Sequence, residues 1–463
     1  MRDYVLLHIN GEPHRITGAA AFQTLSRFLR YEQRATGTKI VCEEGDCGAC
    51  TVLVGRVENG ALRYRPINSC IHFLFQLDCA SIVTVEGLSK HGLTPMQDAM
   101  VQCHGAQCGY CTPGFVMALA GMFETESRDA KQALTGNLCR CTGYESIIRA
   151  AACVEEQPKA DDLYPPQPIL EAIRDVQSEA VRIEHFYKPT SLDEATRFKA
   201  ANPKTVIVQG ATDFGVWRTK RGFAPEAILS LDGLDGLGEL SLDGETLVVG
   251  GRVTLTQFEA AVRGLVPELA RIMDRFGSPQ IKNAGTLAGN IANASPIADT
   301  LPFLYVMNAH LELTGTMGAR VVPIAGFYKG YKTLDLAADE IITRIFIPMP
   351  KDGETLRLYK ISKRSHLDIS SFTAAMLMTR TDGRIEAMRI AYGGVGPTVL
   401  RLTKTEEFLA GRAMALETFL EAGERARGEV APITDVRGTK DYRLQLAENV
   451  MQKFYYDAIG GGA

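Results

Sequence analysis

The chain of 463 residues has the composition of an ordinary globular protein, with 46% hydrophobic, 22% charged and 8% aromatic residues. This profile excludes a disordered, collagen-like or coiled-coil chain, and the length predicts about three folding units. Lys and Arg number 50 against 54 Asp and Glu, which gives a net charge of −4. The chain has no surplus of positive charge for a nucleic acid or an anionic membrane, so we expect neither as a partner.

The N-terminus and the apolar stretches favour a cytoplasmic protein. Asp3 and His8 interrupt the apolar core that a secretory signal would need. The longest uncharged stretch, residues 105–123, contains Pro113 and is too short to span a bilayer. A reducing compartment disfavours disulfides, so the 11 cysteines indicate metal or redox chemistry.

The first third of the chain predicts a β-rich part followed by a helical part. Residues 4–9 form an apolar run that is followed by Asn10-Gly11, a strong hairpin signal. We expect a helix over residues 20–32. Apolar residues then recur at helical spacing over residues 115–123 and 144–151.

The segment 155–179, rich in acidic residues and proline, predicts an extended linker and the main domain border. Beyond it we expect strands over residues 205–208 and 246–249 and helices over residues 255–262 and 267–275. These elements predict a mixed α/β or α+β domain.

From about residue 350 the elements predict a further α+β unit. Strands such as residues 386–392 come first. Helical segments follow after Thr405 and after Tyr442.

Four cysteines have the spacing of a plant-type [2Fe-2S] site. They are Cys42, Cys47, Cys50 and Cys70, in a C-x4-C-x2-C…C arrangement. Gly45 and Gly48 allow positive φ and close backbone approach, so N–H groups can point at the sulfurs. A zinc site is the alternative, although zinc more usually takes paired C-x2-C elements.

Four further cysteines form two short pairs, each where a loop enters a helix. They are Cys108, Cys111, Cys139 and Cys141. Pro113 fits the start of a helix, and helix N-termini would stabilise anionic sulfurs. Two such loops would complete a second site of four sulfurs. The remaining cysteines, Cys79, Cys103 and Cys153, receive no role beyond small core or surface residues.

Two glycine-rich segments are candidates for holding a cofactor. Residues 207–213 predict a strand that ends in a glycine turn, where free N–H groups can hold a pyrophosphate. Residues 283–299 are dense in small and hydroxyl side chains and can lie flat against a cofactor. The sequence has no G-x-G-x-x-G between a strand and a helix, so the usual dinucleotide fold is not expected. The alternative is that both segments are ordinary glycine-rich turns of an α+β domain.

These segments together resemble the molybdenum hydroxylases of the xanthine dehydrogenase type. The resemblance is carried by CEEGDCGAC from Cys42, QCGYCTPG from Gln107 and GNLCRCTGY from Gly136. It covers nearly the whole chain.

The resemblance implies a multidomain α+β fold. An N-terminal β-grasp plant-type ferredoxin domain and a helical [2Fe-2S] domain would precede a two-part FAD-binding α+β domain of the vanillyl-alcohol-oxidase/CO-dehydrogenase flavoprotein type. The expected bounds are 1–82 for the ferredoxin-like domain, 83–154 for the helical domain, 155–179 for the linker, 180–349 for the FAD-binding domain and 350–463 for the C-terminal flavoprotein domain.

The resemblance also implies which residues bind FAD. Those expected at its diphosphate and ribityl chain are Ile207, Val208, Gln209, Gly210, Ala211, Thr212, Asp213, Thr286, Gly289, Asn290, Ser295 and Asp299. Phe276 would stack on the adenine, while Ile342 and Lys360 would lie at the flavin. Tyr331 corresponds to an aromatic position at the nicotinamide entrance, although a lone Tyr is more often a packing residue. Ala211-Thr212 and Ala288-Gly289 depart from the commoner Asn-Thr and Gly-Gly forms.

By the same resemblance the chain is expected to be the electron-transfer subunit of a split enzyme, because a single-chain member would continue for many hundreds of residues. Electrons would pass from a molybdenum centre on a large partner chain to the second cluster, which faces that partner, then to the plant-type cluster, FAD and NAD. The implied reactions oxidise hypoxanthine to xanthine and xanthine to urate. Molybdopterin would lie only on the partner, no catalytic residue of the molybdenum chemistry would lie in this chain, and two small and two large chains would form a heterotetramer.

Three alternatives stay open. The first is the same role in an aldehyde or nicotinate dehydrogenase, because the absent subunit sets the substrate. Those related enzymes more often carry the clusters and the flavin on separate chains, so the fused order favours xanthine dehydrogenase. A non-catalytic iron–sulfur redox sensor would need no FAD, and a zinc-stabilised interaction module would be colourless. The choice between NAD and oxygen as acceptor is also open.

Overall fold

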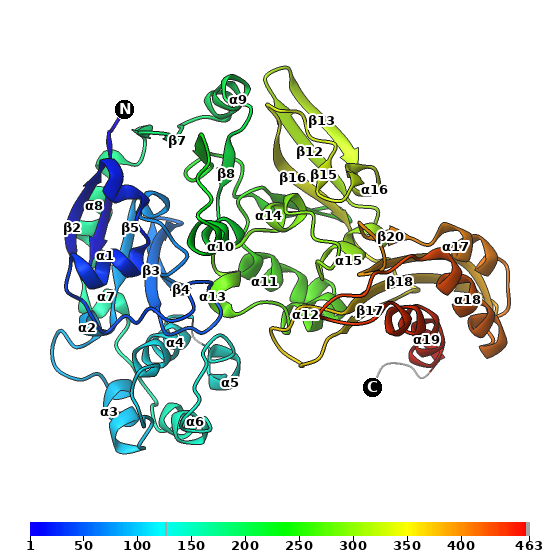
Figure 1. The fold of residues 1–463 in the computed structure, drawn as a ribbon, viewed down its shortest axis with the longest axis horizontal. Coiled ribbons are helices and arrows are strands. Elements are labelled where there is room, and N and C mark those ends of the chain that lie inside the picture. The colour runs from blue at the N-terminus through cyan, green and yellow to red at the C-terminus, as the bar shows by residue number, and fades with distance from the viewer. Residues whose placement is uncertain (126, 460–463) are drawn as a thin grey trace. The chain divides into compact units, whose positions relative to one another are not determined.

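The computed structural model describes residues 1–125 and 127–459. The described chain divides into two compact units, drawn in Figure 1. Unit 1 contains Met1–Asp235, Thr254–Thr256 and Ser278–Thr286, and unit 2 contains the other described residues. The first division between these units follows Asp235.

Unit 1 begins with a five-stranded sheet (blue in Figure 1). Its order is β2-β1-β5-β3-β4, with β1 and β5 parallel and the other pairs antiparallel. Asn10 and Gly11 have φ of +50° and +88°, which confirms the predicted hairpin. The elements are β1 (Tyr4–Ile9), β2 (Glu12–Thr17), η1 (Gly18–Phe22), α1 (Leu25–Tyr31), β3 (Thr51–Glu58), β4 (Ala61–Asn68), η2 (Leu74–Leu77), β5 (Ala80–Val83) and α2 (Val85–Leu88).

The single helix predicted over residues 20–32 is wrong in its first half. A 3-10 turn ends at Phe22, and α1 begins only after Thr24. The Thr24 side chain accepts a hydrogen bond from the backbone N–H of Arg27 and so caps α1. The N-cap residue of α1 therefore interrupts the predicted run.

The predicted helical part follows as α3 (Pro95–Gln102), α4 (Thr112–Glu124), α5 (Ala130–Ala133) and α6 (Glu145–Ala152). Residues 114–123 of α4 are all buried, and the helix packs on β3 and β4. Because α4 is apolar on every side, it belongs to a core rather than to a surface. The apolar packing of α4 joins the helical part to the sheet.

The extended linker predicted over 155–179 is wrong. This segment contains α7 (Ala160–Leu163) and α8 (Pro166–Val176). Pro166 occupies the first turn of α8, where a proline needs no N–H partner, and Ile169 and Ile173 lie one helical turn apart in the core. The prolines that suggested an extended chain instead begin a packed helix.

Unit 1 also contains a four-stranded sheet with the order β6-β7-β9-β8. Its strand β8 confirms the strand expected over 205–208. The elements are β6 (Val181–Ile183), β7 (Phe186–Lys188), α9 (Leu192–Ala201), β8 (Val206–Val208), α10 (Thr212–Arg221), β9 (Ile228–Ser230) and α13 (Pro279–Lys282).

Unit 2 contains a five-stranded antiparallel sheet with the order β10-β11-β16-β12-β13. Strand β11 and helices α11 and α12 confirm the elements expected over 246–249, 255–262 and 267–275. The elements are β10 (Leu240–Asp243), β11 (Thr246–Gly250), α11 (Leu255–Leu265), α12 (Pro267–Met273), α14 (Leu287–Ala292), α15 (Leu301–Val306), β12 (His310–Gly315), β13 (Gly318–Pro323), α16 (Ile324–Phe327), β14 (Tyr328–Gly330), β15 (Thr333–Leu334) and β16 (Ile341–Pro348). The first two residues of α11 belong to unit 1.

The end of the chain forms a second sheet of unit 2, ordered β17-β18-β19-β20, whose three C-terminal helices share one apolar core with it. This confirms the α+β elements expected after residue 350. They are β17 (Glu354–Ile361), β18 (Phe372–Thr381), β19 (Arg384–Gly393), β20 (Leu400–Arg401), α17 (Thr403–Leu409), α18 (Leu416–Glu429) and α19 (Lys440–Ile459). The last four residues of the predicted domain 350–463 lie outside the described residues.

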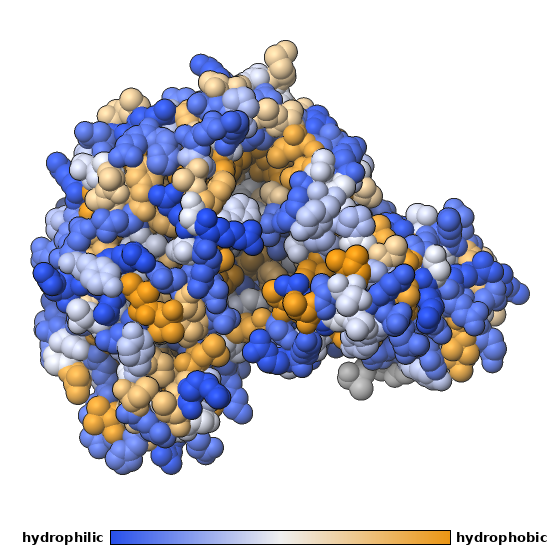
Figure 2. Space-filling view, in the orientation of Figure 1, coloured by the Kyte–Doolittle hydropathy of each residue, from blue (hydrophilic) through white to orange (hydrophobic). Residues whose placement is uncertain are grey.

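Hydrophilic residues dominate the face drawn in Figure 2, with apolar patches among them. Across the described residues, no helix combines the length and hydropathy that crossing a bilayer requires. The multidomain α+β class expected from the sequence is confirmed.

Candidate functional site

The first four cysteines lie together in unit 1, in the loop between α1 and β3 and in the turn after β4. The Cys42 sulfur contacts the sulfurs of Cys47 and Cys70, and the Cys50 sulfur also contacts that of Cys70. Backbone N–H groups of Glu44 and Cys47 point at the Cys42 sulfur. The loop thus connects all four thiols and surrounds one of them with backbone donors, as its glycines predict.

Glycine makes this loop possible at Gly45 and Gly48, whose φ angles are +77° and +69°. A Cβ added at Gly48 would lie 2.3 Å from the carbonyl oxygen of Gly136 and 2.5 Å from Nδ2 of Asn137. A larger residue at this position would therefore push the second cysteine loop away.

The environment favours the thiolate at Cys42 and Cys50. Hydrogen bonds from neighbouring cysteine thiols are the largest cause that lowers the pKa of each, and backbone N–H groups lower it further. Burial acts in the opposite direction. The thiolate is the form of cysteine that binds iron.

The second four cysteines form two sulfur pairs. Cys108 and Cys141 have their sulfurs 3.5 Å apart, and Cys111 contacts Cys139. Cys108 and Cys141 are exposed, whereas Cys139 is buried. The loop before α4 and the loop before α6 each supply two thiols, as the spacing predicts.

Hydrogen bonds surround the Cys139 sulfur. It accepts from the N–H groups of Cys141 and Thr142, both at 3.4 Å, and it lies 3.2 Å from the Thr142 hydroxyl. Burial alone would raise the pKa of Cys139, but these donors outweigh it and lower the pKa. Burial raises the pKa of its neighbour Cys111 to about 12.

The two sets of cysteines are adjacent in unit 1. The N–H of Leu138, the residue before Cys139, donates to the carbonyl of Cys47 at 3.0 Å. Asn137 Nδ2 donates to the carbonyl of Gly48 at 3.1 Å. Gln280, fully buried on α13, donates in turn to Asn137 Oδ1 at 2.8 Å. This chain of hydrogen bonds fixes one loop against the other.

The number and type of donors in each set fit a [2Fe-2S] cluster. Within residues 1–125 and 127–459, no three His, Cys, Asp or Glu side chains converge on one metal-ion position. A zinc ion needs four ligands around one point, whereas a [2Fe-2S] cluster divides its four thiolates between two irons. Four cysteine thiols from nearby loops are the donor set that such a cluster takes.

Residues 207–213, predicted for FAD, lie in unit 1 where β8 leads into α10. Ala211 has the left-handed φ of +50° and forms the N-cap of α10. A Cβ added at Gly210 would lie 2.0 Å from the carbonyl oxygen of Ala284, so only glycine fits there. Gln209 keeps Oε1 buried and without a hydrogen-bond partner among the described residues. A left-handed residue before a helix directs N–H groups outward, which suits an anion such as a diphosphate.

Asp299 and Lys360, both predicted for FAD, form a buried ion pair in unit 2. Lys360 Nζ lies 2.6 Å from Asp299 and also donates to the Asp368 carbonyl at 2.9 Å and to Ser370 Oγ at 2.8 Å. Ser370 donates to Asp299 at 2.6 Å. Burial raises the pKa of Asp299, and Lys360 opposes this shift. The ammonium group thus has partners in three directions.

The other predicted FAD residues are distributed between the units. Thr286 is buried in unit 1. In unit 2, Asn290 on α14 accepts from the Thr300 hydroxyl at 2.6 Å, and Ile342 on β16 is buried. Phe276, Asn290 and Ser295 of unit 2 are partly exposed, and Gly289 is exposed. Tyr331, in the turn between β14 and β15, is 65% exposed.

Sequence reasoning missed several residues that support these sites. Thr142 lies inside the motif GNLCRCTGY, so its position beside Cys139 could have been inferred from that motif. Ser370, Asp368 and Gln280 belong to no motif. Ser370 meets Asp299 across 71 residues and Gln280 meets Asn137 across 143, while Asp368 contacts Lys360 from a loop 8 residues further along the chain. Their roles therefore needed the structure.

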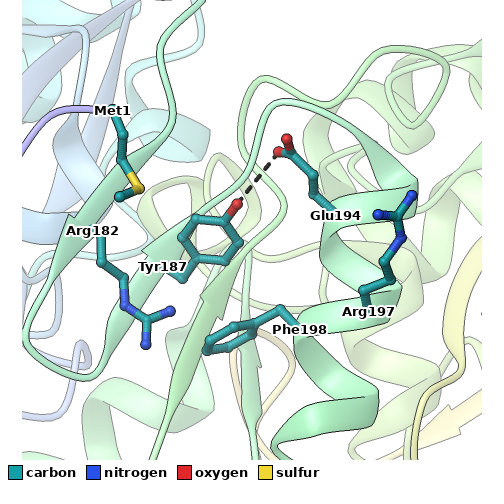
Figure 3. Close-up of a pocket in the computed structure, with 6 residues that line it drawn as sticks. All are labelled: Met1, Arg182, Tyr187, Glu194, Arg197 and Phe198. Carbon is teal, nitrogen blue, oxygen red and sulfur yellow. Dashed lines mark hydrogen bonds between the residues drawn. The ribbon is translucent and has the colours of Figure 1, made fainter.

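A separate pocket of about 440 Å³ lies in unit 1 (Figure 3). Figure 3 shows Tyr187 Oη pointing toward Glu194, at 3.4 Å, with Phe198 on the same helix α9. The pocket is lined by Met1, Arg182, Tyr187, Glu194, Arg197 and Phe198. These differ from every residue predicted for a cluster or for FAD.

Four family models match the chain in succession. They are the 2Fe-2S iron-sulfur cluster binding domain at residues 7–83, the [2Fe-2S] binding domain at 84–152, the FAD binding domain in molybdopterin dehydrogenase at 179–350 and the CO dehydrogenase flavoprotein C-terminal domain at 357–458. Together they represent the iron–sulfur and FAD part of molybdenum hydroxylases. The chain has the domains of this subunit. The predicted domain types of this molybdenum hydroxylase subunit are thereby confirmed.

Relatives and solved structures agree with this assignment. Xanthine dehydrogenase 1 of Arabidopsis thaliana is 26% identical over 97% of this chain and 39% of its own length. Aldehyde oxidase 1 of Bos taurus is 28% identical over 98% and 39%. The chain thus spans about two fifths of these molybdenum hydroxylases.

Two solved structures share the fold over 60% of this chain and 98% of their own. The carbon monoxide dehydrogenase chain from Hydrogenophaga pseudoflava has a TM-score of 0.57 and 26% identity. The quinoline 2-oxidoreductase chain from Pseudomonas putida 86 has a TM-score of 0.56 and 27% identity.

Proposed function

We propose that this chain is the electron-transfer subunit of a xanthine dehydrogenase. Electrons from a molybdenum centre on a partner chain would pass to two [2Fe-2S] clusters, FAD and finally NAD, as hypoxanthine is oxidised to xanthine and xanthine to urate. Iron–sulfur clusters carry single electrons, while a flavin exchanges both single electrons and the hydride that NAD takes. The proposed compartment is the cytoplasm.

The observation that carries this proposal is the adjacency of the two cysteine sets in unit 1. Cys42, Cys47, Cys50 and Cys70 would hold one cluster, and Cys108, Cys111, Cys139 and Cys141 the other. Leu138 N–H donates a hydrogen bond of 3.0 Å to the Cys47 carbonyl. Cys47 belongs to the first set, and Leu138 directly precedes Cys139 of the second set. Such a short connection supports transfer between the two sites rather than two independent roles.

The exposure of the second set supports a partner that docks there. Cys108 and Cys141 are exposed, and the apolar side chains of Tyr110 and Leu138 beside them are 49% and 45% exposed. Apolar side chains around an exposed redox site favour a protein interface. The proposed partner is a large molybdopterin-binding chain, with two copies of each chain in the assembly.

The residues proposed to bind FAD include 207–213 and Thr286. Gly210 lets the Ala284 backbone pack closely against this turn, and the N-terminus of α10 supplies N–H groups to a diphosphate. The residues proposed for FAD also include Phe276, Gly289, Asn290, Ser295, Asp299, Ile342 and Lys360. Lys360 would be held in place by Asp299 and Ser370. Tyr331, being exposed, is the residue proposed to meet nicotinamide.

The visible spectrum of the purified chain, with iron and FAD assays, tests the cofactor part of the proposal. We expect about four irons per FAD. Cys108→Ala should retain about two, because the first cysteine set is intact, whereas Cys79→Ser should retain all four. Bound zinc without colour would contradict the proposal.

Substrate and acceptor are tested on the complex of this chain with its molybdopterin-binding partner. Xanthine should reduce the FAD of the wild-type complex in stopped-flow mixing, and Cys108→Ala should block this reduction while NADH still reduces FAD. The relatives also include an aldehyde oxidase and a quinoline oxidoreductase. Reduction by an aldehyde or an N-heterocycle but not by xanthine would therefore assign the same electron-transfer role to another hydroxylase.

A further inference from the structure

Two cysteines outside the predicted cluster sites lie side by side on the helical part of unit 1. The Cys103 and Cys153 sulfurs are 3.9 Å apart. Cys103 is the C-cap of α3 and Cys153 the C-cap of α6, and these two helices pack against each other. Their sequence separation is 50 residues, so only the folded chain brings them together.

We propose that Cys103 and Cys153 form a reversible intramolecular disulfide, with a low-molecular-weight disulfide such as oxidised glutathione as the oxidant. A disulfide needs sulfurs about 2 Å apart, and rotation of the exposed Cys153 side chain can shorten a contact of 3.9 Å. The helix ends are already held, because Arg149 on α6 donates to the Cys103 carbonyl at 3.2 Å. Little backbone movement is therefore required.

The exchange proceeds in two balanced steps. The thiolate of exposed Cys153 attacks one sulfur of glutathione disulfide, which forms a mixed disulfide and releases one glutathione thiolate. The Cys103 thiolate then attacks the Cys153 sulfur, forms the intramolecular bond and displaces the second glutathione. Two electrons pass from the protein thiols to the reagent, and each of the two glutathiones leaves as a thiol.

The position of the pair gives the disulfide a consequence for the neighbouring site. The closed loop 103–153 encloses Cys108, Cys111, Cys139 and Cys141, all four residues proposed to hold the second cluster. Closing a loop restricts the unfolded chain and so favours the folded one. This consequence rests on the proposed function, whereas the disulfide itself does not.

The test incubates the full chain with oxidised glutathione, blocks remaining thiols and maps cysteine linkages by mass spectrometry. The neighbouring thiol raises the pKa of Cys153, so the reaction is run at mildly alkaline pH. Wild type should give a peptide pair linked through Cys103 and Cys153. Cys103→Ser should stop at a glutathione adduct on Cys153, and the control Cys79→Ser should still form the link.

Separate glutathione adducts on Cys103 and Cys153, no modification of either, or a link that uses another cysteine would overturn the proposal. A second readout is iron retention in urea, where the oxidised wild type should shift the equilibrium toward the folded, iron-containing form by about tenfold or more relative to Cys103→Ser. If the Cys103–Cys153 link forms in a protein that contains no iron, the disulfide proposal is supported and only the proposed function is contradicted.

Discussion

At the scale of single residues, the cysteine loops depend on positions where a side chain has no room. Gly48 has a left-handed φ of +69°, and a Cβ added there would lie 2.3 Å from a backbone oxygen. The backbone oxygen belongs to Gly136, in the loop that leads to Cys139. The residue therefore determines the spacing between the two proposed cluster sites as well as the shape of its own loop.

Gly48→Ala should lower the free energy of unfolding by about 3 kcal/mol, because conformational strain and overpacking add. It should also lose iron from the first cysteine set. Gly60→Ala is the matched control, since φ at Gly60 is +78° but an added Cβ would meet no described atom within 4 Å. It should lose about 1 kcal/mol and no iron. Equal losses in chemical denaturation of the two variants would show that the contact with Gly136 is irrelevant.

At the scale of elements, the sequence predicted strands and helices wherever periodicity and turn residues agreed. The Asn10-Gly11 hairpin and Pro113 at the start of α4 are examples. The same reasoning failed for α8. Proline is common both in extended chains and in the first turn of a helix, so the sequence alone could not distinguish the two. The burial of Ile169 and Ile173, which the structure shows, decides for the helix. For the candidate site, local spacing was enough to group the eight cysteines. It could not find Ser370 beside Lys360, since no short-range pattern joins them.

Ile173→Ala tests whether α8 is a packed helix. Removing the buried side chain should reduce the free energy of unfolding by about 3 kcal/mol and speed proteolytic cleavage within residues 160–176. Arg174→Ala, on the exposed side of the same helix, should change stability by less than about 0.5 kcal/mol. Rapid cleavage of the wild-type segment at the rate of an unstructured peptide would instead support a linker.

At the scale of the whole molecule, a buried charge network ties distant parts of unit 1 together. Asp78, 1% exposed, accepts from Arg2 at 2.9 and 3.0 Å and from Lys188 at 2.8 Å. Arg2 comes from the N-terminus and Lys188 from β7, so one carboxylate connects the ferredoxin-like sheet with the sheet of β6 to β9. Burial alone would raise the pKa of Asp78, but Lys188 and Arg2 outweigh it and lower the pKa.

Asp78→Asn should cost about 3 kcal/mol at neutral pH, because buried Arg2 would lose its carboxylate and Lys188 would keep only Asp232, at 3.8 Å. Since the folded pKa of Asp78 lies below its unfolded value, its contribution is present above that unfolded pKa of about 4 and disappears as pH falls through the folded pKa. The difference between wild type and variant should therefore narrow in acid, as followed by thermal unfolding at several pH values. Asp193→Asn, which removes an exposed partner of Arg197, should have little effect at any pH.

The discontinuity of unit 1 also bears on how the protein is synthesised. The chain leaves unit 1 after Asp235, and the segment Ser278–Thr286 returns to it. That segment carries Gln280, whose hydrogen bond holds Asn137 against the loop of Cys47 and Gly48. The last of the eight cysteines, Cys141, is synthesised well before this segment. The hydrogen bond from Gln280 to Asn137 can therefore form only after the ribosome has released residues 278–286. Until then Asn137 lacks this donor, so the two cysteine loops of a nascent chain are held together less firmly than those of the finished protein.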